Sequence, residues 1–214
     1  HGPAHEILSS SNPESPTFRM RVPETCGGCH GEVKMVVEAL NPTLRKPLFA
    51  YQESVHGRAV QERGSMEAAI CTDCHGVHEI LPPTDSRSPI FKFNIPGMCG
   101  QCHEEVLQTY ADSVHGQAAS LGVGRSPVCT DCHGIHNIKS PVNPESSVAA
   151  QAIARTTCPQ CHQSVSLRDE LGLPVERVQS YLDSYHGLAL QRGSKVVANC
   201  ASCHGIHDIY PSRD

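Results

Sequence analysis

The sequence predicts a chain that is mostly coil with short α-helices and little or no β-structure, and an interior filled by something besides polypeptide. Three observations lead to this prediction. Of 214 residues, 38% are apolar, 4% are aromatic, none is Trp and 16 are Pro, which is a poor composition for a packed polypeptide core. All twelve cysteines fall into C-x-x-C pairs. A histidine follows the second cysteine of every pair.

The six C-x-x-C-H motifs predict covalently attached c-type haem, because this is the attachment motif of that cofactor. Only 14 residues in the chain are His, so a His at the same place in all six motifs is far beyond chance. Six haems would supply the missing apolar core. The predicted attachment cysteines and proximal iron ligands are Cys26, Cys29 and His30; Cys71, Cys74 and His75; Cys99, Cys102 and His103; Cys129, Cys132 and His133; Cys158, Cys161 and His162; and Cys200, Cys203 and His204.

Structural zinc and disulfides are the alternatives to haem. Zinc ribbons pair two C-x-x-C knuckles around one ion and have no use for a His fused to every knuckle. A disulfide scaffold would not space its cysteines so uniformly. Both alternatives are therefore disfavoured.

The motifs belong to a diheme module that occurs three times, and this internal repeat indicates a repeat architecture. Each module holds a first motif, an S-x-H-G stretch, a second motif and a histidine three residues after the second motif. The predicted organisation is 1–25, an N-terminal partial repeat and linker; 26–80, module 1; 81–138, a linker and module 2; and 139–214, a linker and module 3.

The segment before module 1 repeats the linkers between modules. His5 is followed by LSSSNPESP, as His78 is by LPPTDSRSP and His136 by KSPVNPESS. We therefore expect His5 to be the counterpart of His78 and His136, in the tail of a further module. Short amphipathic helices are expected at 32–40, 103–119, 147–155 and 174–190, and coil in the Pro-rich linkers.

The extra histidines suit distal iron ligands. His78 cannot ligate the iron bound by His75, because three residues span at most roughly 10 Å and the second axial site lies across the macrocycle. The spacing from each extra histidine to the next motif is nearly constant, whereas the spacing back is erratic. Our hypothesis is that haems one to six take, in that order, His5, His56, His78, His115, His136 and His186; the alternative is surface or core histidines.

This assignment leaves His207 and His1 without a haem. The C-terminal HGIHDI resembles the N-terminal HGPAHEI, so one copy's tail matches the next copy's head. Head-to-tail association could place His207, His1 or His5 on a haem of a neighbouring copy, and a repeating contact that does not close gives a filament. The alternative is that His207 is a relic of duplication.

The net charge limits the possible binding partners, and the haem motifs predict where the protein is located. The formal net charge is −5 before haem propionates are counted, which argues against nucleic acid as a partner. Covalent haem attachment takes place outside the cytoplasm, and the chain shows no apolar run of spanning length. We expect a mature, soluble, extracytoplasmic protein, extracellular in preference to periplasmic, with no membrane span.

With its doubled CxxCH motifs and the CxxCHGxH and SxHG signatures, the chain from His5 to Ile209 resembles the multihaem c-type cytochromes. The resemblance implies a haem-cored electron carrier with bis-histidine haems and other redox proteins as donor and acceptor. Some relatives are soluble periplasmic shuttles; others polymerise head to tail into extracellular nanowires that reach minerals, electrodes or partner cells. The tandem modules and matching ends favour the filament type.

Multihaem reductases of nitrite, hydroxylamine or sulfur oxyanions form the alternative class. They resemble this chain in haem density, but they keep one haem open or replace its proximal histidine. All six motifs here end in His, and the extra histidines outnumber the distal sites. The sequence therefore predicts an electron-transfer protein and not an enzyme.

Overall fold

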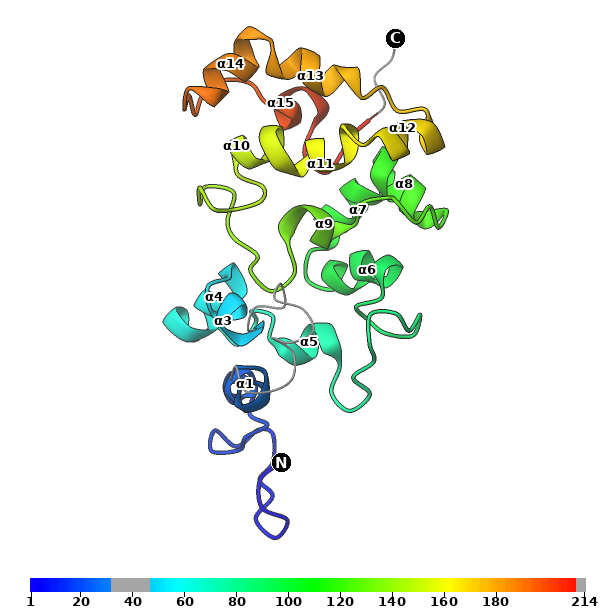
Figure 1. The fold of residues 1–214 in the computed structure, drawn as a ribbon. Coiled ribbons are helices and arrows are strands. Elements are labelled where there is room, and N and C mark those ends of the chain that lie inside the picture. Colours follow the sequence, from blue (N-terminus) through cyan, green and yellow to red (C-terminus); the bar gives the residue numbers. More distant parts are fainter. Residues whose placement is uncertain (32–46, 211–214) are drawn as a thin grey trace. The chain divides into compact units, whose positions relative to one another are not determined.

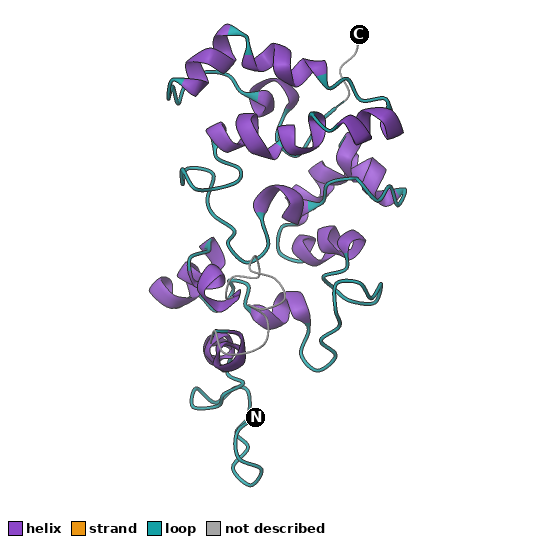
Figure 2. Cartoon of the chain, viewed as in Figure 1, coloured by secondary structure: helices purple, strands orange, loops and turns teal. Residues whose placement is uncertain are grey.

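The computed structural model describes residues 1–31 and 47–210, and its secondary structure is short helices joined by loops (Figure 2). Helices take up 51% of the described residues, and no strand occurs among them. The prediction of short helices with little or no β-structure is confirmed. No helix in the described ranges has the length and apolarity needed to cross a membrane.

The chain divides into two compact units, and their α-helices are labelled in Figure 1. Unit 1 comprises 1–94 and 135–138, and unit 2 comprises 95–134 and 139–214. The elements of unit 1 are η1 (Arg19–Arg21), α1 (Val22–His30), α3 (Pro47–Gln52), α4 (Val55–Arg63), α5 (Cys71–His75) and η2 (Lys92–Asn94). The elements of unit 2 are α6 (Ile95–Gly100), α7 (Glu104–Asp112), α8 (Val114–Ser120), α9 (Cys129–His133), α10 (Ala150–Ala152), the π-helical turn η3 (Ile153–Thr157), α11 (Pro159–His162), α12 (Val165–Leu171), α13 (Glu176–Leu182), α14 (Tyr185–Gln191) and α15 (Cys200–His204).

Two of the predicted helices are broken where a serine caps a new helix. The range 103–119 divides at Ser113 into α7 and α8, because Ser113 is extended (ψ 161°) and its Oγ accepts the Gly116 N–H at 3.1 Å. The range 174–190 divides in the same way before α14, where Ser184 is the cap. Helix in 147–155 begins only at Ala150, and the predicted helix 32–40 lies outside the described residues.

The S-x-H-G stretch begins α4, α8 and α14 in the same way each time. In α8 the Ser113 hydroxyl also donates to the Tyr110 carbonyl at 2.6 Å. A Cβ on Gly116 would lie 2.0 Å from that same carbonyl oxygen, so only glycine fits. The Tyr110 hydroxyl donates to the carbonyl of Pro127, two residues before the second motif. These contacts hold the S-x-H-G helix against the second motif, and they recur around Tyr51, Ser54, Gly57 and Ala69 and around Tyr181, Ser184, Gly187 and Ala198.

The linkers fold into one repeated turn, which includes the N-terminal segment. A serine hydroxyl at its centre donates to the carbonyl seven residues earlier, from Ser15 to Leu8, Ser88 to Leu81 and Ser146 to Lys139. All three serines are buried. Residues 8–18 thus adopt the turn of 81–91 and 139–149, as the sequence repeat predicts.

The described residues bury little apolar side chain. Many large apolar side chains are instead exposed, among them Val77, Ile135 and Ile206. The buried apolar side chains in the described ranges are Ala59, Val60, Ile70, Ile95, Ala119, Val128, Ala149, Ala154, Leu167 and Leu190.

Candidate haem-binding sites

The second motif of each module is a five-residue helix with its own start and stop signals. The Asp73 carboxylate accepts the Ile70 N–H at 2.8 Å at the start of α5, and Asp131 caps α9 in the same way. At α15 the cap is neutral, formed by Asn199 and Ser202. Each helix ends in a glycine of positive φ, which a side chain would strain: Gly76, Gly134 and Gly205 at 79°, 78° and 83°. The two cysteines and the histidine of the motif are thus presented from one fixed turn.

In module 1 an arginine that precedes the first motif binds the second motif. Arg19, three residues before α1, donates to both carboxylate oxygens of Asp73 at 2.7 and 3.0 Å. It also donates to the carbonyls of Met66 and Ala68 in the loop before α5. Burial alone would raise the pKa of Asp73, but the hydrogen bonds from Arg19 and from the Ile70 N–H lower it below its ordinary value. Asp73 therefore stays ionised and holds α5 in place.

The two motifs of each module lie together. The helix α1 packs on α5, α6 on α9, and η3 on α15. In each case the first cysteines of the two motifs are within hydrogen-bonding reach: Cys26 with Cys71, Cys99 with Cys129, and Cys158 with Cys200. Groups attached to the two motifs of a module would therefore be neighbours.

The cysteines are available for attachment. All twelve are described, and none forms a disulfide. Burial, reinforced by Cys26, raises the pKa of Cys71 to about 12. The Cys158 thiol donates to Cys200, which raises the pKa of Cys158 and lowers that of Cys200 to about 7.

Among the described residues, histidines from different parts of the repeat face each other with almost one spacing. Their ring centroids lie 5.9 to 6.1 Å apart, and three of the pairs are within 19° of parallel. Two imidazole nitrogens on opposite sides of one metal ion, each about 2 Å from it, place the ring centres roughly 6 Å apart. The spacing therefore fits two axial ligands of one iron. The pairs are His75–His136, His133–His207, His115–His162 and His1–His78.

The environment of these pairs favours the neutral imidazole. Burial lowers the pKa of His75, His136, His133, His207, His115 and His162. Neutral imidazole is the form that binds a metal. An exposed apolar side chain also stands between the second motif and the next histidine in every module: Val77, Ile135 and Ile206 are 68%, 70% and 67% exposed. The residues present thus fit haem, with ligands on both faces and uncovered apolar side chains beside them.

The pairs differ from the sequential assignment predicted above. The His136 ring faces His75, whereas the sequential assignment pairs it with the first motif of module 3; the His115 ring faces His162, whereas the assignment pairs it with His133. His78 faces His1, and His207 faces His133. The serine-centred linker turn and the Tyr–Ser–Gly contacts also fix the constant forward spacing, so the sequential assignment stays a prediction.

The remaining candidate ligands lie at the following places. His56 lies half-buried on α4, and its charge acts on Asp73. His103 precedes α7 and lies near His133, while His30 lies near His75. His186 packs edge-on against the Tyr185 ring at 5.9 Å, and no ring partner is found for His5 or His204 within the described ranges.

The sequence analysis missed the helix caps Asp73 and Asp131 and the ion pair between Arg19 and Asp73. Asp73 and Asp131 stand two residues after the first cysteine of their motifs, a spacing that puts a carboxylate at the third helical position. That signal was present in the sequence. The partnership of Arg19 with Asp73 had no such signal, because 54 residues separate them.

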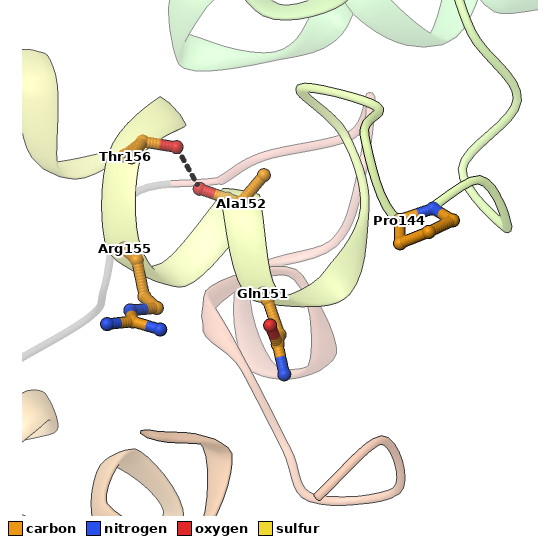
Figure 3. A pocket seen from close by; sticks show the side chains of 5 residues that line it. All are labelled: Pro144, Gln151, Ala152, Arg155 and Thr156. Atoms are coloured by element: carbon orange, nitrogen blue, oxygen red, sulfur yellow. Dashed lines mark hydrogen bonds between the residues drawn. The ribbon is translucent and has the colours of Figure 1, made fainter. Parts of the chain in front are cut away.

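One surface hollow lies apart from the motif residues. It has a volume of about 440 Å³ and is lined by side chains of α10 and η3 with Pro144 of the linker, and the Thr156 hydroxyl donates to the Ala152 carbonyl at its edge (Figure 3). Arg155 is its one ionisable lining residue. In the part of the chain that the structure describes, no group of three or more His, Cys, Asp or Glu side chains is arranged to hold a metal ion.

Comparisons with protein-family models, curated proteins and solved structures found no match to this chain.

Proposed function

We propose that the protein is a hexahaem c-type cytochrome that conducts electrons along a chain of closely spaced bis-histidine haems. The observation that carries the proposal is the set of facing histidine pairs near 6 Å. Three of them join a C-x-x-C-H histidine to a histidine of another motif type. The bound iron would supply one-electron oxidation and reduction.

The role of the polypeptide would be to hold the haems and set the distances between them. The caps and terminal glycines of α5, α9 and α15 orient the motif histidines. The S-x-H-G contacts aim His115 at His162 from a rigid helix start. Pairing a motif histidine with one from the next module links the modules by ligation, so a chain of haems would run from module to module.

The proposal extends to assembly and location. We propose an extracytoplasmic protein, extracellular in preference to periplasmic, that forms a head-to-tail filament and passes electrons between redox proteins or to minerals or electrodes. Support comes from the repeat, whose N-terminal turn at 8–18 copies the internal linkers. A soluble periplasmic shuttle is the alternative.

Haem content and ligation test the proposal directly. Intact mass and pyridine haemochrome analysis of protein isolated from its source should give six haems per chain. Absorption and electron paramagnetic resonance spectra should show low-spin iron, and redox titration should give low potentials, because no Met ligand raises them. A zinc content matching the cysteine pairs, without haem, would overturn the proposal.

An open iron site would point to the reductase alternative instead. The test is addition of nitrite or hydroxylamine to assembled native protein at neutral pH. We expect no change in the spectrum, because histidine pairs occupy both axial positions. Binding with turnover would show an enzyme.

A further inference from the structure

The first two S-x-H-G helices each bind a short segment of the following module. We call Gly134–Ile138 tail 2 and Gly205–Ile209 tail 3. The Val55 N–H, the first in α4, donates at 2.8 Å to the carbonyl of the last residue of tail 2. The Val114 N–H, the first in α8, donates at 2.9 Å to the carbonyl of the last residue of tail 3. We call these two contacts the tail bonds, and each one crosses from a module to the next.

Helix geometry makes both donors available. The first N–H groups of an α-helix have no partner within the helix, so each needs one from elsewhere. The Ser54 hydroxyl accepts the Gly57 N–H at the third position of α4, and the Ser113 hydroxyl accepts the Gly116 N–H of α8. The serine cap therefore serves the third N–H, and the first N–H is left for the tail.

Tail 2 depends on this bond for its position. After α9 ends, the tail forms neither helix nor strand. Among the described residues, the bond from Val55 is the one hydrogen bond that reaches Ile135–Ile138. These four residues belong to unit 1, whereas the residues on both sides of them belong to unit 2. Tail 2 is therefore positioned by module 1 and not by the module to which it belongs in sequence.

Each tail bond lies two residues from a histidine that faces a second-motif histidine. His136 faces His75 with ring centroids 5.9 Å apart and 14° between the planes. His207 faces His133 at 5.9 Å and 19°. Two residues of chain span at most about 7 Å, so a tail that is held at its last residue keeps its histidine close to the facing ring.

The start of α8 acts on two histidine pairs at once. Its first residue, Val114, holds tail 3 through the backbone. Its second residue, His115, faces His162 at 6.1 Å through the side chain. Because the two contacts use different groups, the N–H of Val114 can be removed while the imidazole of His115 stays in place.

We infer that the backbone N–H groups of Val55 and Val114 are positioning groups for iron ligation. They keep His136 and His207 on the irons that the second motifs of the preceding modules bind. Loss of one hydrogen bond changes an equilibrium constant by about tenfold, so without its tail bond each tail histidine should leave its iron about tenfold more readily. This inference rests on the proposed function, because the irons are those of the haems.

Amide hydrogen exchange of the native, haem-loaded protein tests the tail bonds themselves. The first N–H of a helix normally exchanges fast, because it lacks a partner within the helix. We expect slow exchange at Val55 and Val114. The control is Val165, the first residue of α12, whose N–H has no hydrogen-bond partner among the described residues and should exchange fast. Equally fast exchange at all three positions would overturn the inference.

Proline substitution removes the donor with little strain. Proline is tolerated at the first helical position and needs an extended residue before it, and Ser54 is extended with ψ 165°. Val55→Ala is the control that keeps the N–H. Val165→Pro is the control for proline itself, since it also stands first in a helix after an extended serine, Ser164, with ψ 118°.

Carbon monoxide binding to the reduced, haem-loaded protein measures the effect on ligation. Carbon monoxide needs an open axial position, so it binds a bis-histidine haem only after one histidine has left. In Val55→Pro one haem should bind about tenfold faster than in native protein, and in Val55→Pro combined with Val114→Pro two haems should do so. Val55→Ala and Val165→Pro should bind as native protein does.

Two further variants show which histidine and which iron are involved. His136→Ala removes the ligand, so adding Val55→Pro to it should make no second haem fast. Replacing Cys71 and Cys74 with Ala removes the haem of the second motif in module 1, and the fast phase of Val55→Pro should disappear with it.

The outcomes separate this inference from the proposed function. A second fast haem beside His136→Ala, or native rates in Val55→Pro protein that carries six haems, would overturn the inference and leave electron transfer standing. A fast phase that survives the loss of Cys71 and Cys74 would overturn it as well, because His136 would then serve another iron. Absence of haem from the native chain would refute the proposed function.

Discussion

The two motifs of a module have the same C-x-x-C-H pattern but are built differently. The second motif is a five-residue helix in all three modules, with a cap before it and a positive-φ glycine after it. The first motif lies in α1 after the short helix η1, across the end of α6, or after the π-helical turn η3. The second motif carries its structural signals within a few residues, whereas the first depends on the linker that precedes it.

The largest effect should come from the S-x-H-G helix that supports the second motif. Gly116→Ala puts a Cβ 2.0 Å from the Tyr110 carbonyl oxygen, so the backbone must move. We expect a loss of about 3 kcal/mol or more in unfolding free energy. The matched control is Gly97→Ala in α6 near a first motif, where nothing lies within 4 Å and no loss is expected. Equal unfolding temperatures for the two variants would remove the contrast between the motifs.

The glycine after the second motif should come next. Gly134 has φ 78° and ψ −177°, a conformation that is essentially restricted to glycine. Gly134→Ala should therefore cost about 1–3 kcal/mol. Gly28→Ala, within a first motif and with open space around it, should be neutral or stabilising by up to about 1 kcal/mol. Thermal unfolding of both haem-loaded variants measures this, and a stable Gly134→Ala would show that the stop signal is dispensable.

The serine cap should have a smaller effect. Ser113 is buried and bonds both the Gly116 N–H and the Tyr110 carbonyl. Ser113→Ala should cost about 1–2 kcal/mol, the usual range for a lost N-cap. Ser120→Ala on the exposed end of α8 should stay within about 0.5 kcal/mol. Chemical denaturation of the two variants measures the difference, and equal midpoints would show that the Ser113 cap does not stabilise the protein.

These contrasts explain what the sequence could predict. The motifs, the modules and the linker repeat are local patterns, so the similarity of 8–18 to the internal linkers could be read directly. The breaks at Ser113 and Ser184 were also readable, since serine before a helix is a cap, but the apolar periodicity runs through them. Local sequence signals are therefore enough to predict the motifs, the linker turns and the helix boundaries.

Ligand pairing is not a local property, and the sequential assignment of distal histidines stays a prediction. Even spacing from His78 to Cys99 and from His136 to Cys158 suggested ligation of the next haem. The Ser88 and Ser146 turns also fix that spacing, and the structure brings the His136 ring against His75. A constant separation in sequence can report a conserved loop as easily as a shared metal. Only the meeting of modules in space decides which histidines face each other.

The smallest expected effect concerns the cap of the second motif, which is charged in α5 and neutral in α15. Asp73→Ser gives module 1 the cap residue of module 3 and removes the ion pair with Arg19, whose side chain is 29% exposed against 38% for Asp73. Because solvent screens this pair, the loss should be about 1 kcal/mol or less. The lowered pKa of Asp73 means that its contribution is present above the ordinary pKa of about 4 and is lost as pH falls through the lower folded value. Urea unfolding at pH 7 and in steps below pH 4 should therefore separate native and variant protein at pH 7 and narrow the difference as the pH falls; a difference that does not narrow in acid would mean that Asp73 acts through packing and not through charge.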